Sequence, residues 1–251
     1  MTPKRVAVIT GASSGIGRKA CSLFYKKGWR VLAVGRRKMR PASYMSAYYS
    51  VDLSKSEETE DFISAILSSE DRVDVLVNNA AYQVCKPLVE TELKEWRDVF
   101  AVNLESPFLL AKGLFSLLGR AKGSIVNVSS VHAYASSKDI SSYAASKAGL
   151  IALTRNMAIE FGRAGVRVNA VAPGAVNTPM LEAGLKRAGI TGDGLQAQLA
   201  NIGSKHILGR VGTPDEIAQV IYFLADDKLS SFITGQAIVA DGGALAKLST
   251  E

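Results

Sequence analysis

Val6-Ala7-Val8-Ile9-Thr10-Gly11-Ala12-Ser13-Ser14-Gly15-Ile16-Gly17 is the stretch that decides the fold. Its first four residues have the pattern of a buried strand, and after Gly17 the apolar residues Ala20, Leu23 and Phe24 recur at helical spacing. A glycine loop between a strand and a helix lets backbone amides approach a pyrophosphate, whose charge the helix amino terminus favours. The spacing is Gly-x-x-x-Gly-x-Gly rather than the common Gly-x-Gly-x-x-Gly, so the loop alone is weak evidence.

Strand and helix patterns alternate along the rest of the chain. We expect strands at 6–9, 30–34, 47–51, 73–77, 124–128, 167–171 and 237–240. Long helical patterns cover 91–118, with a bend near Pro107, and 140–161. Parallel strands need long crossover connections, so this order predicts an α/β fold, a single doubly wound (Rossmann-type) domain over residues 1–251 with a seven-stranded parallel sheet.

Two segments depart from the alternation. Residues 35–49 are too short and irregular for a full crossover helix, so the second βα unit is trimmed. Residues 174–213 contain repeated glycines between two short helical pieces, which predicts a small helical lid at about 180–212.

Tyr143 and Lys147 lie four residues apart in a helical pattern and therefore share one helix face. A free phenol has a pKa of about 10, and an ammonium one turn away lowers it, which makes Tyr143 usable as a general acid or base. Ser130 follows the strand at 124–128, at the sheet edge where ligands bind, and its hydroxyl can polarise a carbonyl. Each feature alone has an ordinary explanation, a solvated helix face or the end of a strand, but their combination favours catalysis.

Composition limits the function classes. The length of 251 residues with 47% hydrophobic residues suits one large folded domain. No apolar stretch reaches the roughly 18 residues of a membrane span, and we expect neither a signal peptide nor membrane binding. Cys21 and Cys85 are isolated, which fits a reducing, cytoplasmic location. The net charge of +7 is interleaved with acids except around Arg36 to Arg40, and no aromatic residues there form a stacking platform, so we expect no nucleic-acid partner.

With these residues in place, the chain resembles the short-chain dehydrogenase/reductase family from Val6 to Gly243. The matching segments are TGASSGIG at 10–17, Asp52-Leu53, NNAA at 78–81, Asn103, Ser130, YAASK at 143–147, PGAVNTPM at 173–180 and ITGQAIVADGG ending at Gly243. The resemblance implies hydride transfer between a nicotinamide dinucleotide and a carbonyl/alcohol pair without a metal. The only histidines, His132 and His206, offer no metal cluster.

The resemblance also implies a catalytic set of four residues. Tyr143 is the proton donor in reduction and the acceptor in oxidation, while Lys147 lowers its pKa and binds the nicotinamide ribose. Ser130 positions and polarises the carbonyl, and Asn103 anchors a water that links Lys147 to solvent.

The implied cofactor residues are spread over five segments. Asp52 accepts from the adenine amino group, Asn79 with Ala80 lines the adenine ribose, and Thr178 holds the nicotinamide carboxamide. The full set is Gly11, Ser13, Ser14, Gly15, Ile16, Gly17, Arg36, Arg37, Asp52, Leu53, Asn79, Ala80, Tyr143, Lys147, Pro173, Gly174, Val176 and Thr178.

The end of the strand at 30–34 predicts NADP(H) in preference to NAD(H). An acid at this place accepts from the ribose hydroxyls and repels a 2′-phosphate, but here Gly35-Arg36-Arg37 follows. Arg36 can offer paired donors to a phosphate, whereas Ser13 and Ser14 add at most hydroxyl donors. The alternative is that the two arginines only cover surface.

The substrate pocket is expected between residues 82–85, 131–134 and 175–177. Tyr82, Gln83, His132 and Tyr134 are the candidate contacts, and no arginine or lysine lies in these segments, although Lys86, Lys186 or Lys205 could swing in. We therefore expect a neutral sugar, polyol or ketone, as in the similar sugar and polyol dehydrogenases. A 3-oxoacyl-thioester reductase is the alternative enzyme, and a non-catalytic dinucleotide-binding regulator is the alternative of another class.

The apolar residues between Leu104 and Leu118 exceed what one sheet-facing stripe requires. Together with the usual assembly of the family, they predict a homo-oligomer, a homotetramer. The apolar end of the chain, 233–245, offers a second interface.

Overall fold

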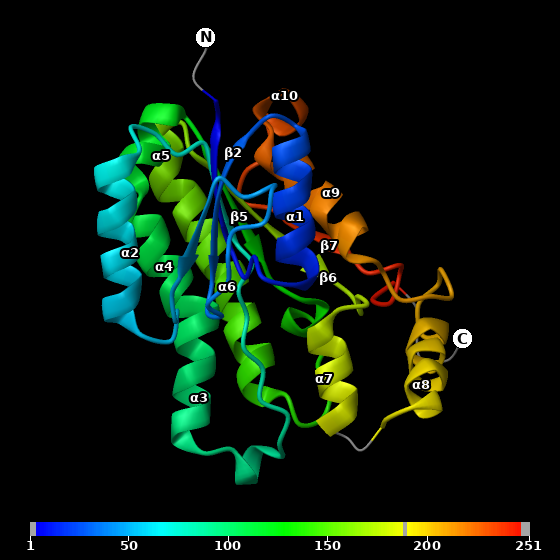
Figure 1. The fold of residues 1–251 in the computed structure, drawn as a ribbon. Coiled ribbons are helices and arrows are strands. Elements are labelled where there is room, and N and C mark those ends of the chain that lie inside the picture. The colour runs from blue at the N-terminus through cyan, green and yellow to red at the C-terminus, as the bar shows by residue number, and fades with distance from the viewer. Residues whose placement is uncertain (1–3, 188–189, 247–251) are drawn as a thin grey trace.

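The strands form one parallel sheet in the computed structural model, which describes residues 4–187 and 190–246. The strand order is β3-β2-β1-β4-β5-β6-β7, as in a doubly wound fold (Figure 1). The bounds are β1 (Val6–Thr10), β2 (Arg30–Gly35), β3 (Ala47–Ser50), β4 (Val75–Asn78), β5 (Ser124–Val128), β6 (Arg167–Pro173) and β7 (Ala237–Ala240). Each strand lies within two residues of its predicted place, and the predicted fold class is confirmed.

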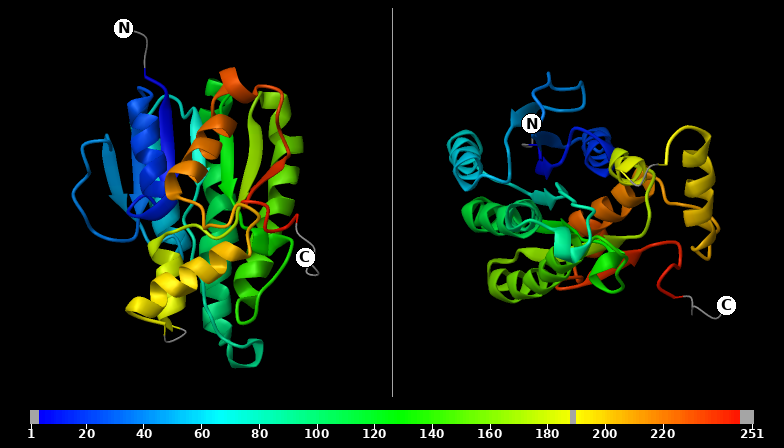
Figure 2. Two further views of the ribbon diagram at one scale, coloured as in Figure 1. Left: turned by 90° about the vertical axis from the view of Figure 1, so that its right-hand side faces the viewer. Right: turned by 90° about the horizontal axis from the view of Figure 1, so that it is seen from below.

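Helices cover both faces of this sheet (Figures 1 and 2). Ala7 and Ile9 of β1 face the layer of α1 (Gly15–Lys26) and α9 (Pro214–Ala225). Val6 and Val8 face the other layer, α2 (Ser56–Ser69), α4 (Ser106–Gly113) and α6 (Ser141–Phe161). Successive side chains of a strand point to opposite faces, so both sides of a central strand must be apolar. Residues 36–46 contain no helix, which confirms the trimmed second unit.

The long helical pattern at 91–118 is divided differently from the prediction. α3 (Leu93–Phe100) passes through a π-helical turn (Ala101–Glu105) into α4, and the sharp bend of 60° comes only before α5 (Phe115–Ala121), at Leu114. The expected bend near Pro107 is wrong. Pro107 lies in the first turn of α4, directly after the π-helical turn. The wider π-helical turn tolerates the absence of a proline N–H, so the helix continues.

Gly113, just before this bend, allows close helix packing. A Cβ at this position would lie 2.6 Å from Ile63 Cγ2 of α2. Among residues 4–187 and 190–246, no single helix is long and apolar enough to cross a membrane; only the bent pair of Leu93–Gly113 with Phe115–Ala121 passes by length and composition.

After β6 the chain leaves the sheet for two helices, α7 (Pro179–Arg187) and α8 (Asp193–Ser204), where two short helical pieces were predicted. They extend past the carboxyl ends of the strands (Figure 2). The two ends of the segment that carries α7 and α8 are paired by a parallel β-bridge between Val176 and Gly212. Thr213 then caps α9. Residues 188–189 of the predicted lid lie outside the described residues. The remaining helix is α10 (Asp227–Ser230), and short 3₁₀ turns occupy Leu88–Glu90, Val131–Ala133 and Gly162–Ala164.

Candidate active site

Ser130, Tyr143 and Lys147 meet at the carboxyl ends of the strands. Ser130 follows β5, and its Oγ accepts a hydrogen bond from the backbone N of His132 at 3.2 Å. Tyr143 and Lys147 lie in the first two turns of α6, and all three side chains are buried. Ser129 Oγ donates to the Lys147 carbonyl at 2.9 Å, which fixes this part of α6 against the end of β5.

Lys147 is a buried amine with a strongly perturbed pKa. It is 1% exposed, and its Nζ donates to the Val128 carbonyl at 2.7 Å. Nζ also lies 5.7 Å from the centroid of the Tyr143 ring. Burial disfavours the ammonium and lowers the pKa of Lys147 to about 7. At neutral pH this amine can therefore both release and accept a proton.

Tyr143 differs from the sequence expectation. Burial raises its pKa to about 12, and the hydrogen bond with the Ser130 hydroxyl only partly opposes this rise. The expectation that Lys147 lowers the pKa of Tyr143 is thus wrong for this structure. The reason is physical: desolvation penalises the phenolate, and an amine whose own pKa is near 7 offers only a fraction of a positive charge at neutral pH.

Asn103 lies in the π-helical turn and is fully buried. Its Oδ1 accepts from the Tyr82 backbone N at 2.8 Å, and its Nδ2 donates to the Tyr82 carbonyl at 2.9 Å and to Ser146 Oγ at 3.0 Å. Ser146 Oγ in turn donates to the Tyr143 carbonyl at 2.8 Å. Asn103 therefore ties the loop after β4 to the catalytic turn of α6. Sequence reasoning missed Ser146, for which the only signal was a small hydroxyl residue beside Lys147.

The glycine loop is pinned from behind by the segment after β4. Asn79 Nδ2 donates to the Thr10 carbonyl at 2.9 Å, and Thr10 Oγ1 accepts from the backbone N of Asn79 and of Ala80, both at 3.0 Å. A Cβ at Gly11, whose φ is +66°, would lie 2.6 Å from Asn79 Nδ2. Asn79 and Ala80 thus hold the loop in shape, and only glycine fits there.

The amino end of α1 can take an anion. Ser14 is its N-cap residue but makes no side-chain capping bond, so the first amides of this 12-residue helix keep their donors for a ligand. Thr178 reaches the same loop from the segment after β6, because a Cβ at Gly15 would lie 3.3 Å from Thr178 Cγ2. The glycine loop before α1 and the segment after β6 together form a site that fits a dinucleotide, called the cradle below.

The residues after β2 are held by β3. Tyr48 Oη donates to the Arg37 carbonyl at 2.7 Å and Ser50 Oγ to the Arg36 carbonyl at 3.3 Å, while both arginine side chains are exposed. Burial raises the pKa of Asp52, but hydrogen bonds from Ser54 and the charges of Arg36 and Lys55 outweigh it, so the pKa is lowered. Asp52 is therefore held as a carboxylate at this end of the cradle, and Leu53 beside it is buried.

Of the remaining cofactor candidates, Gly174 packs directly on the chain after β7, since a Cβ there would lie 2.8 Å from Asp241 Cα. Pro173 is the last residue of β6, and Val176 is buried at the bridge to Gly212.

His132 is the substrate candidate that lies nearest the reacting groups. Its ring centroid is 6.2 Å from that of Tyr143, and its Nδ1 lies 3.3 Å from the Ala135 carbonyl. Burial lowers the pKa of His132, opposed by Ala135, so the imidazole is neutral at physiological pH. Tyr82 and Tyr134 are exposed, with Tyr134 at 52%, and Gln83 is half-buried.

Three lysines, Lys86, Lys186 and Lys205, are the cations that could reach the expected substrate segments. Lys86 Nζ pairs with Glu95 Oε1 at 2.6 Å, so it is engaged elsewhere. Lys186 and Lys205 are exposed. Arg187, which ends α7 and is likewise exposed, places Nη2 3.5 Å from Cys85 Sγ. Sequence reasoning missed this residue because it is 102 positions away from Cys85 in the chain.

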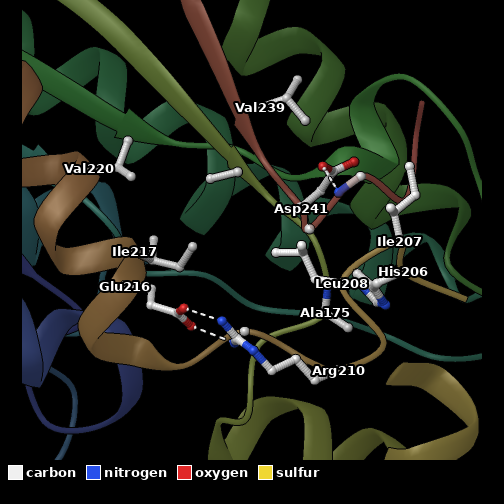
Figure 3. A pocket seen from close by; sticks show the side chains of 14 residues that line it. Ala175, His206, Ile207, Leu208, Arg210, Glu216, Ile217, Val220, Val239 and Asp241 are labelled. Atoms are coloured by element: carbon white, nitrogen blue, oxygen red, sulfur yellow. Dashed lines mark hydrogen bonds and ion pairs between the residues drawn. The ribbon is translucent and has the colours of Figure 1, made fainter. Parts of the chain in front are cut away.

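A cavity of about 440 Å³ lies between α9, the loop before it and the end of β7 (Figure 3). Its wall includes His206, Leu208, Ile217 and Val239, and Arg210 pairs across its rim with Glu216. None of Asn103, Ser130, Tyr143 or Lys147 lines it. This cavity is therefore separate from the candidate catalytic groups.

Comparison with known proteins adds four findings. The family described as enoyl-(acyl carrier protein) reductase matches residues 11–244. The curated 3-oxoacyl-(acyl-carrier-protein) reductase FabG of Thermotoga maritima is 37% identical over 249 residues, 95% of this chain and 97% of that protein. Among solved structures, the ligand-free aldohexose dehydrogenase of Thermoplasma acidophilum has a TM-score of 0.92 at 30% identity, over 98% of this chain and 96% of that one. A 4-hydroxyisoleucine dehydrogenase complexed with NADH has a TM-score of 0.85 at 29% identity, over 98% and 100%.

Proposed function

The chain belongs to the short-chain dehydrogenase/reductase family, and from that premise we propose that it transfers a hydride between NADP(H) and a small carbonyl or alcohol, a sugar, polyol or ketone. The observation that carries this proposal is the buried set of Ser130, Tyr143 and Lys147, with a neutral His132 beside it. A protein that only sensed dinucleotides would gain nothing from burying an amine next to a phenol.

In reduction, Tyr143 is the proton donor. Its raised pKa keeps the phenol protonated at neutral pH, so the hydroxyl can donate to the carbonyl oxygen, together with Ser130. The bound nicotinamide supplies the hydride. As Tyr143 releases its proton, the developing phenolate favours a charged Lys147, and the buried amine, with a pKa of about 7, can then return a proton. Asn103 and Ser146 hold this turn of α6 in position.

The groups that would hold the dinucleotide are those of the cradle. The loop amides at the start of α1 take the pyrophosphate, Asp52 the adenine and Thr178 the nicotinamide end. NADP(H) preference rests on Arg36, whose backbone Ser50 anchors and whose side chain is exposed where an NAD-selective protein carries an acid. The relative that holds NADH leaves this choice open, so it stays part of the proposal.

The alternative enzyme is a 3-oxoacyl-thioester reductase, which the 37% identity to FabG favours. The likeness to an aldohexose dehydrogenase favours a sugar as the substrate.

We propose that residues 1–251 form one domain and that α7 and α8, within about 180–212, act as the lid over either substrate. Cys21 and Cys85 are free thiols, which fits the cytoplasm.

We propose a homotetramer as the assembled form. A groove between the α3–α4 segment and α6 is lined by apolar side chains, among them Phe100, Leu104, Phe108 and Leu153. Phe108 is 44% exposed, and on the far edge of the sheet Val239 is 41% exposed, so each face offers apolar surface to a second copy.

The test of the activity is NADPH oxidation followed by absorbance, with aldoses, small ketones and an acetoacetyl thioester. Turnover of a sugar or ketone supports the proposal, whereas a thioester that reacts far faster supports the alternative enzyme. Tight NADPH binding without turnover on the whole panel, in both directions, would instead identify a regulator.

A further inference from the structure

The π-helical turn that carries Asn103 contains a backbone carbonyl whose amide partner is missing. In this turn the Ser106 N–H donates to the Ala101 carbonyl, five residues back. The same spacing assigns the next N–H, at position 107, to the Val102 carbonyl, but Pro107 has none. The Val102 carbonyl accepts from the Ser106 hydroxyl instead, at 3.0 Å. A side chain therefore replaces the amide donor that Pro107 lacks.

A hydroxyl bond of this kind in an ordinary helix adds to an amide bond and does not replace it. In α2 the Lys55 carbonyl accepts from the backbone N of Thr59 at 3.2 Å and also from Thr59 Oγ1 at 3.1 Å. Removing the Thr59 hydroxyl leaves that carbonyl paired, whereas removing the Ser106 hydroxyl takes away the donor of the Val102 carbonyl. Ser106 is 2% exposed, so water has little access to take its place.

The π-helical turn lies against α6 at two points. Asn103 Nδ2 donates to Ser146 Oγ at 3.0 Å, and a Cβ at Gly149 would lie 3.1 Å from Leu104 Cδ2. Ser146 and Gly149 are three residues apart and share one face of α6. A change from π-helical to α-helical winding shifts the register by one residue, which rotates side chains by about 100° around the helix axis. The contacts of residues 103 and 104 with α6 therefore depend on the π-helical register.

The side chain of Asn103 also connects the turn to the catalytic tyrosine and to the loop after β4. Ser146 Oγ donates to the Tyr143 carbonyl at 2.8 Å. On its other side, Asn103 accepts from the Tyr82 backbone N at 2.8 Å and donates to the Tyr82 carbonyl at 2.9 Å. A chain of hydrogen bonds thus runs from the π-helical turn to the first turn of α6, in which Tyr143 lies.

We propose that Ser106 is a positioning residue, whose hydroxyl holds the turn in π-helical form and thereby holds the Asn103 amide in place. This rests on the proposed function, in which Tyr143 donates the proton. It deepens that function by naming the residue that fixes the turn of α6 around the tyrosine.

Pairing of the backbone carbonyls explains why the hydroxyl matters. In π-helical winding the Ser106 hydroxyl completes the pairing of the Val102 carbonyl. In α-helical winding the unpaired carbonyl would be that of Asn103, four residues before Pro107. Without the hydroxyl, neither winding pairs every carbonyl, so the turn is free to leave the register that places the Asn103 amide.

The first test examines the turn without any turnover. Hydrogen–deuterium exchange of the peptide that holds Tyr82 is followed by mass spectrometry in the ligand-free protein, because the Tyr82 N–H donates to Asn103 Oδ1. We expect exchange at this amide to be about 10-fold faster in Ser106→Ala than in wild type. Ser106→Thr keeps the hydroxyl and the wild-type exchange. Thr59→Val, which removes a fully buried hydroxyl from α2, is the matched control and leaves this peptide unchanged.

The second test separates positioning from folding. Single-turnover reduction with NADPH is measured in the same variants and in Ser106→Ala/Pro107→Ala, whose new N–H at position 107 can donate to the Val102 carbonyl. We expect Ser106→Ala to lower the rate about 10-fold, with the Kd for NADPH unchanged, and the double variant to recover most of this loss. Ser106→Thr and Thr59→Val keep the wild-type rate.

Three results overturn the inference. One is a Ser106→Ala variant with wild-type exchange and rate, and another is an equal loss in Ser106→Ala and Thr59→Val, which would show only the general cost of removing a buried hydroxyl. The third is a double variant as slow as Ser106→Ala, because the hydroxyl would then not stand in for the missing amide. If no carbonyl or alcohol is turned over but the exchange pattern is seen, the proposed reaction fails and the positioning of Asn103 by Ser106 stands.

Discussion

Replacing Lys147 by methionine is expected to stabilise the protein while it stops turnover. The side chain is 1% exposed, and its Nζ donates to the Val128 carbonyl at 2.7 Å. Methionine has a similar length and no charge, so it keeps the packing and removes the cost of a buried ammonium.

The size of the effect follows from the pKa of this amine, which burial lowers from 10.5 to about 7. Below about pH 7 the amine is protonated in both the folded and the unfolded protein, and the full cost of burying the charge is present. Between about pH 7 and 10.5 the unfolded chain binds the extra proton, so the free energy of unfolding of the wild type rises with pH through this window.

At about 1.4 kcal/mol for each tenfold change, the lowered pKa corresponds to about 5 kcal/mol at low pH. In the methionine variant the Val128 carbonyl has lost its donor, which destabilises the variant by about 1–3 kcal/mol and offsets part of this gain. We therefore expect Lys147→Met to be about 2–4 kcal/mol more stable near pH 6 and to lose that advantage near pH 10. Tyr143 adds no slope below about pH 9; above it the unfolded phenol, with a pKa of about 10, begins to lose its proton while the buried phenol, with a pKa of about 12, keeps it, which changes the free energy of unfolding in the same direction in both proteins.

The assay is urea unfolding of the ligand-free protein at several pH values, followed by tryptophan fluorescence, with light scattering to check that assembly is the same. Lys138→Met is the matched control, since Lys138 is exposed in the loop before α6. A Lys147→Met variant that is less stable than wild type near pH 6, or that keeps the wild-type dependence on pH, would refute the reasoning.

Two further predictions concern the cofactor and the assembly. Arg36→Asp should weaken NADPH binding about 10- to 100-fold and leave NADH binding almost unchanged, measured by titration calorimetry, with Arg40→Asp as the control; equal affinity of the wild type for both cofactors would contradict this. Phe108→Glu, which places a charge in the apolar groove beside α6, should convert the tetramer to smaller species in light scattering at micromolar concentration, whereas a wild type that is already a clean monomer would reject the assembly.

Local patterns were sufficient to predict the sheet. A buried parallel strand is a short apolar run, and the central runs became strands buried on both faces because helices cover them, while β3 and β7 form the partly exposed edges. The spacing of Tyr143 and Lys147 was equally local, since one helix turn brings the pair together whatever surrounds it.

What depends on tertiary contacts was not predictable. The pKa of Tyr143 is set by burial against chain segments that are distant in sequence, and a rule based on one neighbouring ammonium gave the wrong direction. The bend at Leu114 lies where the leucines of α5 pack into the core beside the sheet. From the sequence alone, Pro107 was the stronger signal for a bend. Arg187 meets Cys85 only because α7 folds back over the strand ends.

The rate of hydride transfer in Tyr143→Phe tests the central claim most directly. The change removes the transferable proton and keeps the ring in its buried place. In a single turnover with NADPH and the best carbonyl substrate, we expect a rate about 10²–10⁴-fold below wild type, with the Kd for NADPH unchanged. A variant that retains more than about a tenth of the wild-type rate would contradict the assignment of Tyr143 as the general acid.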